Sequence, residues 1–363
     1  MVDANGGEIP SLGAWQGADL SGTASQNAGV GVDAGLPPRT RFLSGVAKLV
    51  RRRKATTGAD SDPVRPAIFL LEPAAPTAKL GRVTKRVPML DNGLTALAGR
   101  LWFVNAGVFS GHYVELEDVD DDALFNVVTG ELQLDKVATI VFDPRTRIPT
   151  VRYYPNGLGE PDAVELLDVV GAEVTLPRIF EVIGQVYQTC LITPEAQARA
   201  GKLWKDELKW WASESAEDLV QLHLRVGLIT AFPTCTVRHE QTDVPGRLDI
   251  EIEESDPLDR SRITRYGILE LKILRSFGST GKAYSAQYNL DWVESGVRQA
   301  ASYRDQRGAR AAALCCFDMR KEHSGEQCFH HVRDLAKDLS VELRLWFIFA
   351  TSERFREFVT QTQ

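Results

Sequence analysis

The chain has 363 residues, of which 44% are apolar and 25% charged, and its formal net charge is −7. These values are ordinary for a globular protein, and the length is sufficient for two modest domains. The negative charge argues against indiscriminate binding to nucleic acid. The sequence has no apolar run long enough to span a membrane, no signal-peptide pattern and only five sparse cysteines. We therefore expect a cytoplasmic protein that does not contact a membrane.

The first 64 residues are rich in Gly, Ala, Ser and Asp and show little hydrophobic periodicity. Such a segment buries too little apolar surface to offset the entropy lost on ordering, so we expect residues 1–64 to be mostly disordered. A basic run within it, Arg51 to Lys54, either contacts phosphate or ends a short helix around Phe42 to Val50.

Residues 65–195 are predicted to form a β-rich domain followed by a helical link. Turn signals separate apolar runs that indicate strands near 67–71, 101–104, 112–116, 139–142 and 150–154. The region shows no combination of residues typical of catalysis. By default we expect it to provide specificity or to bind a protein partner or a second copy of the chain.

Three tryptophans, Trp204, Trp210 and Trp211, lie among charged residues in the segment 203–211. The pattern indicates an amphipathic helix between the two halves of the chain, with the tryptophans packed in the interface. Stacking of bases on these rings is the alternative.

Residues 196–363 are predicted to form an α/β domain. A helix is expected at 215–229, where Ser215 can cap the helix and apolar residues recur at helical spacing. The elements expected after it are strands at 235–241, 247–253 and 266–274, a helix at 290–305, a strand at 311–317 and a last strand at 341–350. The core order is therefore α-β-β-β-α-β.

Acidic residues alternate with apolar ones in the strand that contains Asp249, Glu251 and Glu253. In the next strand, Glu270 and Lys272 share a face with apolar neighbours, which predicts that both are buried. A simple Glu270–Lys272 ion pair would satisfy them. However, a hairpin can also bring Asp249 close to Glu270, and two adjacent carboxylates require a cation, for which Mg²⁺ or Mn²⁺ is suitable.

These residues resemble the signature of the restriction-endonuclease-like, or PD-(D/E)xK, nuclease superfamily. The chain reads Gly246-Arg247-Leu248-Asp249, then a connection of 20 residues, then Glu270-Leu271-Lys272; Pro245 lies four residues before Asp249, so the Pro-Asp pair is absent. Glu217 occupies the place of a glutamate that family members often carry on the preceding helix. Gln299 and Tyr303 match the Gln-x-x-x-Tyr pattern of branches related to the RecB nuclease.

The resemblance implies a restriction-endonuclease-like fold and assigns roles to individual residues. Asp249, Glu270 and the carbonyl of Leu271 would bind Mg²⁺ or Mn²⁺, and Lys272 would orient or activate the attacking water. Lys272 is expected to have a lowered pKa if it is desolvated. The supporting residues that it implies are Glu217 at the metal or water, and Gln299 and Tyr303 at the substrate backbone or in support of Lys272. Glu251 and Glu253 share the face of Asp249 in the alternating strand, so they are the reserve ligands.

The loop 275–288 follows the active strand and contains Gly278 and Gly281, which predict mobility. Its Arg275 and Lys282 could bind a phosphate backbone, and its tyrosines could stack on bases.

The resemblance implies a metal-dependent endonuclease that hydrolyses DNA, with RNA as the alternative substrate, in phage defence or DNA processing. A second hypothesis is a catalytically silent subunit of the same fold that binds DNA or assembles a complex. A third is an interaction protein that does not bind nucleic acid, which predicts no salt-dependent association with DNA.

Overall fold

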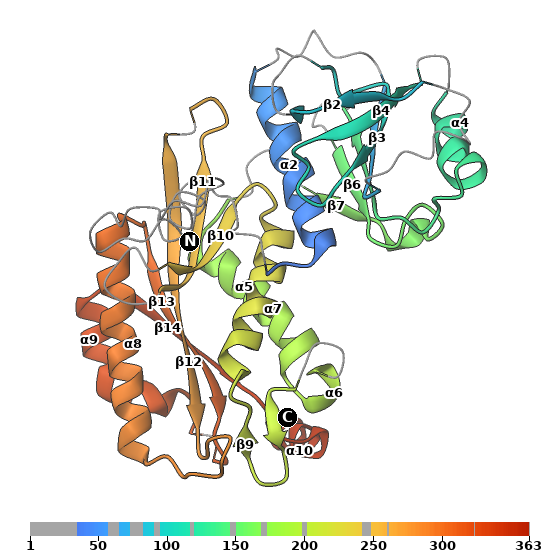
Figure 1. Cartoon of the computed structure of the whole chain (residues 1–363). Helices are drawn as coiled ribbons and strands as arrows, with labels where there is room; N and C mark the ends of the chain where they lie inside the picture. Colours follow the sequence, from blue (N-terminus) through green and yellow to red (C-terminus); the bar gives the residue numbers. More distant parts are fainter. Residues whose placement is uncertain are drawn as a thin grey trace, which may run out of the picture. The chain divides into compact units, whose positions relative to one another are not determined.

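Two mixed sheets with the helices that cover them, and one two-stranded sheet, make up the part of the chain that the structure describes (Figure 1). The computed structural model describes residues 35–56, 65–72, 83–90, 95–116, 120–145, 150–167, 173–197, 202–241, 248–259, 261–322 and 324–362. The protein is therefore α/β, as its sequence predicts. None of the helices in these ranges is long and apolar enough to cross a membrane.

The first sheet has seven strands in the order β2-β4-β3-β1-β5-β6-β7. Its strands are β1 Ala67–Leu70, β2 Lys85–Val87, β3 Arg100–Val104, β4 Gly111–Glu115, β5 Thr139–Asp143, β6 Thr150–Tyr154 and β7 Glu165–Leu167. β1 and β3 pair in parallel, and the other neighbours are antiparallel. The five strands predicted here are confirmed to within about a residue, because their short apolar runs are bounded by turn residues.

Side-chain alternation divides this sheet between two hydrophobic clusters. Phe69 and Trp102 pack with the helix α2, Pro38–Thr56, on one face. Phe103 packs with α4, Asp121–Asn126, and the π-helical turn that follows it on the other. Both faces of the sheet are therefore buried, which explains the apolar runs of its strands.

Helix α2 corrects the expectation of disorder for residues 38–56. Phe42, Val46 and Val50 recur every fourth residue on one helix face, and all three are fully buried. The helix is longer than the predicted segment Phe42 to Val50, because packing rather than composition stabilises it. Arg51 forms an ion pair with Glu254, and Arg53 donates to the carbonyl of Thr95, so neither arginine is held for phosphate. Residues 1–34 and 57–64 lie outside the described residues.

The predicted link contains helix α5, Leu176–Val186, a π-helical turn and α6, Pro194–Gln197. The tryptophan segment after it is a two-stranded hairpin of β8, Trp204–Asp206, and β9, Trp211–Ala212, so the prediction of a helix is wrong. The rings of Trp204 and Trp210 are buried and meet edge to face at 5.7 Å between centroids. Aromatic packing therefore decides the local structure, and these two rings are closed to bases.

The second sheet has the order β10-β11-β12-β13-β14. Its elements are α7 Ala216–Ala231, β10 Thr236–Gln241, β11 Leu248–Ser255, β12 Ile263–Arg275, α8 Ala286–Arg307, β13 Ala312–Met319, a 3-10 segment Gly325–Val332, α9 Arg333–Asp338, β14 Val341–Phe347 and α10 Ser352–Thr362. The predicted order α-β-β-β-α-β is present. β10, β11 and β12 pair antiparallel, whereas β12, β13 and β14 run parallel.

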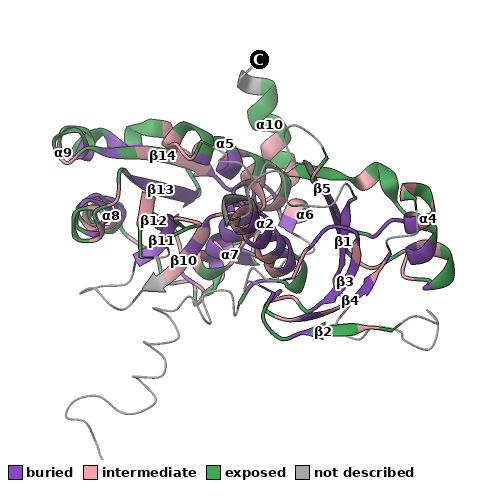
Figure 2. Ribbon diagram, turned by 90° about the horizontal axis from the view of Figure 1, so that it is seen from above, coloured by how far each residue is buried: buried purple, intermediate pink, exposed green. Residues whose placement is uncertain are grey.

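Helices cover both faces of this sheet, with α5 and α7 on one side and α8 and α9 on the other (Figure 2). A side chain at Gly267 of β12 would meet Leu176 and Ile179 of α5. On the opposite face, Val293, Val297 and Ala300 of α8 join the cluster around β12 and β13. The middle strand is therefore enclosed, and its ionisable side chains are shielded from water.

Gly227 allows α7 to approach α5 closely. A Cβ atom at this position would lie 2.3 Å from Cγ2 of Val186, whereas one at Gly184 in α5 would meet nothing within 4 Å. The position of α7, and with it the position of Glu217, therefore depends on a glycine in the middle of a helix.

We expect Gly227→Ala to lower the free energy of unfolding by about 1–3 kcal/mol, because the overpacking outweighs the roughly 1 kcal/mol gain in helix propensity. Urea denaturation measures the change. Gly184→Ala is the matched control and should be neutral or stabilising. Adding Val186→Ala, which removes the clashing methyl group, should recover part of the loss. If Gly227→Ala is as stable as Gly184→Ala, the close approach of the helices is wrong.

Candidate active site

Asp249 lies where β11 and β12 stop pairing. The ladder runs from Ser255 opposite Ile263 to Ile250 opposite Leu269. Beyond it, the Leu271 amide donates to Oδ2 of Asp249 at 2.8 Å, so a carboxylate replaces a main-chain acceptor. The side-chain amide of Gln221 on α7 donates to the main-chain carbonyl of Asp249, also at 2.8 Å. The side chain and the main chain of Asp249 are thus both fixed, and its carboxylate is directed towards the middle strand.

Glu270 and Lys272 lie on the face of β12 that α8 covers. Nζ of Lys272 lies 2.6 Å from Oε1 of Glu270, and the two residues are 4% and 1% exposed. The ammonium also lies 4.4 Å from the centre of the Trp292 ring. A Cβ atom at Gly296 would approach the Lys272 stem to 3.2 Å, so this glycine leaves room for the lysine. The predicted ion pair exists, and it is buried.

The ion pair does not satisfy Glu270 fully. Its Oε2 is buried and has no hydrogen-bond partner among the described residues. Burial first, and then the charge of Asp249, raise the pKa of Glu270 to about 8, although Lys272 lowers it. A carboxylate with an unpaired buried oxygen next to a second carboxylate favours a bound cation.

Lys272 keeps its proton. Burial lowers its pKa, but the attraction and hydrogen bond of Glu270, followed by the charges of Asp249 and Glu217, outweigh burial and shift the pKa upward. The expectation of a lowered pKa is therefore wrong, because it considered desolvation without the carboxylates around the amine. The structure presents Lys272 as a cation.

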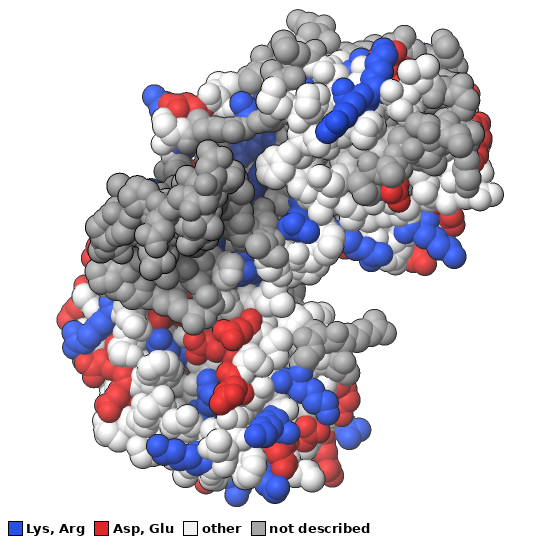
Figure 3. Space-filling model, viewed as in Figure 1, with Lys and Arg blue, Asp and Glu red and all other residues white. Residues whose placement is uncertain are grey.

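Glu217 belongs to the site electrostatically. It is half-buried in the first turn of α7, and its charge raises the pKa of both Glu270 and Lys272, after the larger causes named above. The neighbouring Asp218 is exposed. Acidic side chains gather over the lower end of α7 in Figure 3. Of these two acids, Glu217 is therefore the one that acts on the site.

Tyr303 and Gln299 lie on α8, four residues apart as predicted. Tyr303 is 2% exposed, and burial, followed by the charges of Glu270 and Asp249, raises its pKa. Oε1 of Gln299 is buried without a hydrogen-bond partner among the described residues. The helix face that includes Trp292, Gly296, Gln299 and Tyr303 therefore covers the strand that carries Glu270 and Lys272.

The loop after β12 is a tight hairpin rather than an open loop. Gly278 donates to the carbonyl of Lys282, and Tyr284 donates to the carbonyl of Ser276, both at 2.9 Å. Gly281, with a φ of +79°, lies against the Trp211 ring. Glycine thus serves here to permit a turn and a close ring contact, a role that the sequence analysis did not predict. Lys282 is exposed on this hairpin.

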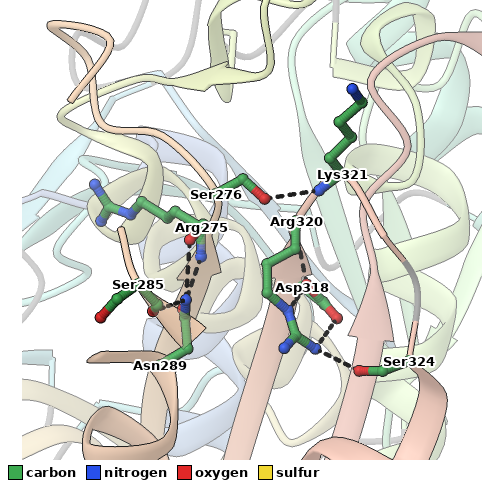
Figure 4. Close-up of polar contacts among 8 residues, drawn as sticks. All are labelled: Arg275, Ser276, Ser285, Asn289, Asp318, Arg320, Lys321 and Ser324. Atoms are coloured by element: carbon green, nitrogen blue, oxygen red, sulfur yellow. Dashed lines mark hydrogen bonds and ion pairs between the residues drawn. The ribbon is translucent and has the colours of Figure 1, made fainter. Parts of the chain in front are cut away.

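Arg275 ends β12 at the carboxyl edge of the sheet (Figure 4). Asn289 of α8 accepts from the Arg275 amide and donates to its carbonyl, both at 3.1 Å. The guanidinium points away from these contacts in Figure 4. The nearby Arg320 is different, since it donates to both oxygens of the buried Asp318. Arg275 is therefore held by its main chain, with its charged group directed outward.

Glu251 and Glu253 are not reserve ligands. Arg307 donates to both carboxylate oxygens of Glu251, at 3.2 and 2.9 Å, and Arg265 lies 3.1 Å from one of them. Glu253 pairs with Arg238. Opposite charges already balance both acids, so the alternation in β11 places three carboxylates in two different environments.

The sequence analysis did not predict four supporting residues, namely Gln221, Trp292, Gly296 and Asn289. A glycine inside a helix is a usable signal, because it costs helix stability and therefore points to close packing at Gly296. Gln221 lies four residues after Glu217 and thus on the same helix face. The roles of Trp292 and Asn289 depend on the β12–α8 contact, which has no local signature.

The oxygen atoms present are compatible with Mg²⁺ or Mn²⁺. Among the described residues, no three His, Cys, Asp or Glu side chains gather into a ready-made metal site. Mg²⁺ commonly keeps several waters and uses only one or two carboxylates. Asp249 and the unpaired oxygen of Glu270 supply these, and the Leu271 carbonyl points to the same strand edge as its amide. The residues therefore suit a hydrated divalent cation.

Comparisons of the chain with family models, curated proteins and solved structures return no match.

The raised pKa of Glu270 predicts a specific pH dependence of stability. The folded state binds the proton of Glu270 more tightly than the unfolded state does. The stability that this gives is fully present below the pKa of the unfolded state, and it is lost as the pH rises through about 8. The melting temperature of the metal-free protein should therefore fall between about pH 5 and pH 8. Scanning calorimetry measures the slope. Glu270→Gln, which cannot ionise, should flatten it, and an unchanged slope in that variant would contradict this assignment.

Proposed function

We propose that the chain is a metal-dependent nuclease that hydrolyses phosphodiester bonds of DNA, with a restriction-endonuclease-like core of the PD-(D/E)xK type. The observation that carries the proposal is the buried group of Asp249, Glu270 and Lys272, in which one carboxylate oxygen has no partner among the described residues. The order α-β-β-β-α-β around it agrees with this core. A setting in phage defence or DNA processing is the natural context of such an activity.

The roles follow from charge and position. Asp249, Glu270 and the Leu271 carbonyl would hold Mg²⁺ or Mn²⁺, which when bound would polarise the scissile phosphate and stabilise its developing charge. Lys272, protonated and fixed between Glu270 and Trp292, would donate hydrogen bonds to a phosphate oxygen or to the attacking water. In this cationic state it orients and stabilises rather than removing a proton.

The second candidate is a catalytically silent subunit that binds DNA or assembles a complex. The direct Glu270–Lys272 ion pair supports it, because this contact alone explains why both residues tolerate burial. It does not explain the unpaired Glu270 Oε2 next to a second carboxylate. For that reason we favour the enzyme. In either case the seven-stranded sheet is the expected site for a protein partner or a second copy of the chain.

Cleavage of plasmid and single-stranded DNA with Mg²⁺ or Mn²⁺ tests the activity. Asp249→Asn and Lys272→Met should each lower the rate by about 100-fold or more, because the first weakens the hold on the metal ion and the second removes a positive charge next to the phosphate. Lys337→Ala, an exposed lysine on α9, is the matched control and should keep full activity. Circular dichroism checks that each variant is folded. Equal cleavage by the parent and both site variants would place the activity elsewhere.

Metal titration separates the enzyme from the silent subunit. At a Mn²⁺ concentration of about 100 times Kd, we expect a stabilisation of about 2.7 kcal/mol at pH 8. Asp249→Asn should abolish it, since one of two ligand carboxylates loses its charge. Isothermal calorimetry measures binding directly. If the parent binds neither Mg²⁺ nor Mn²⁺, the metal-dependent mechanism is excluded and the silent subunit is the better reading.

A further inference from the structure

Three aromatic rings extend from Lys272 along the first turns of α8 to the hairpin that precedes it. The Lys272 ammonium lies 4.4 Å from the centre of the Trp292 ring. The Trp292 and Tyr288 rings are nearly parallel, at 14° and 6.1 Å between centroids, and the Tyr288 and Tyr284 rings are 4.6 Å apart. We call Tyr284, Tyr288 and Trp292 the aromatic strip. It leads directly away from the proposed catalytic lysine.

The middle ring of the strip is accessible, unlike the rings of the Trp204–Trp210 pair. Tyr288 is 43% exposed, whereas Trp204 and Trp210 are 1% and 7% exposed. Tyr284 rests against the backbone of the hairpin at Gly278, so its ring orientation is fixed. An exposed tyrosine between two neighbouring rings offers a flat apolar surface at little entropic cost. Packing within the helix accounts for the spacing of the rings but not for the exposure of Tyr288.

The main chains of two basic residues, Arg275 and Lys321, are anchored close to the residues of the strip. Asn289, the residue after Tyr288, holds the main chain of Arg275, and the guanidinium of Arg275 points away from that contact (Figure 4). The Lys321 amide donates to Ser276, and the amine of Lys321 also points outward in Figure 4. The amino terminus of α8, capped by Ser285, adds the positive end of a helix dipole. A phosphate beside the strip would therefore meet the positive end of this helix dipole.

We propose that the aromatic strip binds the unpaired bases of a DNA strand whose scissile phosphate lies at Asp249, Glu270 and Lys272. This inference rests on the proposed function and gives it a substrate class, namely single-stranded DNA or a single-stranded end. In a duplex the flat faces of the bases are stacked on one another, so they cannot lie against protein rings. Flat aromatic surfaces flanked by basic groups are the usual means of binding single strands without sequence preference.

Binding is measured by fluorescence anisotropy with a labelled DNA 12-mer, its duplex, and the same 12-mer with central abasic sites. The protein carries Glu270→Gln to prevent cleavage. We expect the intact single strand to bind more tightly than the duplex. We also expect the abasic strand, which keeps its phosphates but lacks bases, to bind about 5- to 100-fold more weakly than the intact strand.

Variants of the strip localise the effect. Tyr288→Ala should weaken single-strand binding by a similar factor of about 5 to 100, and Tyr288→Leu should weaken it as well, because leucine keeps apolar volume without a flat ring. Tyr288→Phe should bind like the parent. Phe109→Ala, which removes an exposed aromatic from the loop between β3 and β4, is the control. Equal affinity for duplex and single strand, or an unchanged affinity in Tyr288→Ala, overturns the inference.

Failure of this inference differs from failure of the proposed function. If the parent cleaves duplex DNA as well as single strands, and Lys272→Met abolishes both, the nuclease stands and the strip is not its substrate site. If the parent cleaves nothing but binds single strands through Tyr288, the strip is a binding site in a silent subunit. Cleavage confined to single strands, with a raised KM in Tyr288→Ala, supports both.

Discussion

The structure around β12 depends on one constraint: two carboxylates and an ammonium lie on the adjacent strands β11 and β12, in a sheet that helices enclose on both faces. Enclosure makes each unpaired charge costly, and a buried pair is tolerated only when its geometry is well fixed. Glu270 and Lys272 satisfy one another at 2.6 Å, but Asp249 adds a second negative charge that this contact does not balance. The proximity of Asp249 therefore raises the pKa of Glu270, and a divalent cation bound by the two carboxylates would offset their repulsion.

The surrounding elements hold that arrangement in place. Because β11 and β12 stop pairing beyond the Ile250–Leu269 pair, the Asp249 carboxylate can replace a main-chain acceptor at the Leu271 amide. Gln221 fixes the main chain of Asp249 from α7, and Gly296 allows α8 to lie close to the Lys272 stem. Strand divergence, a helix amide and a helix glycine thus position three charges on two adjacent strands.

Sequence periodicity predicted the strands and helices of the second sheet well, because alternation and helical spacing report burial directly. It also predicted that Asp249, Glu270 and Lys272 lie close together, which the structure confirms. It failed where tertiary contacts override local pattern. Helix α2 is stabilised by a sheet that lies later in the chain, and Trp204 and Trp210 form a hairpin because their rings pack on one another. The direction of the Lys272 pKa shift depends on neighbouring charges, which no spacing rule provides.

The contrast between Glu251 and Glu270 is the strongest argument that the second acid has a role beyond stability. Both are buried on adjacent strands, at 0% and 1% exposure. Glu251 is contacted by Arg307 and Arg265, so both of its oxygens have cationic partners. Glu270 receives one lysine on one oxygen and faces a second carboxylate. The same fold thus gives both oxygens of one buried glutamate a cationic partner and leaves one oxygen of the other glutamate without a hydrogen bond among the described residues. A buried carboxyl group with an unpaired oxygen, next to Asp249 and a fixed ammonium, is the arrangement expected where a bound cation and a phosphate supply the remaining partners.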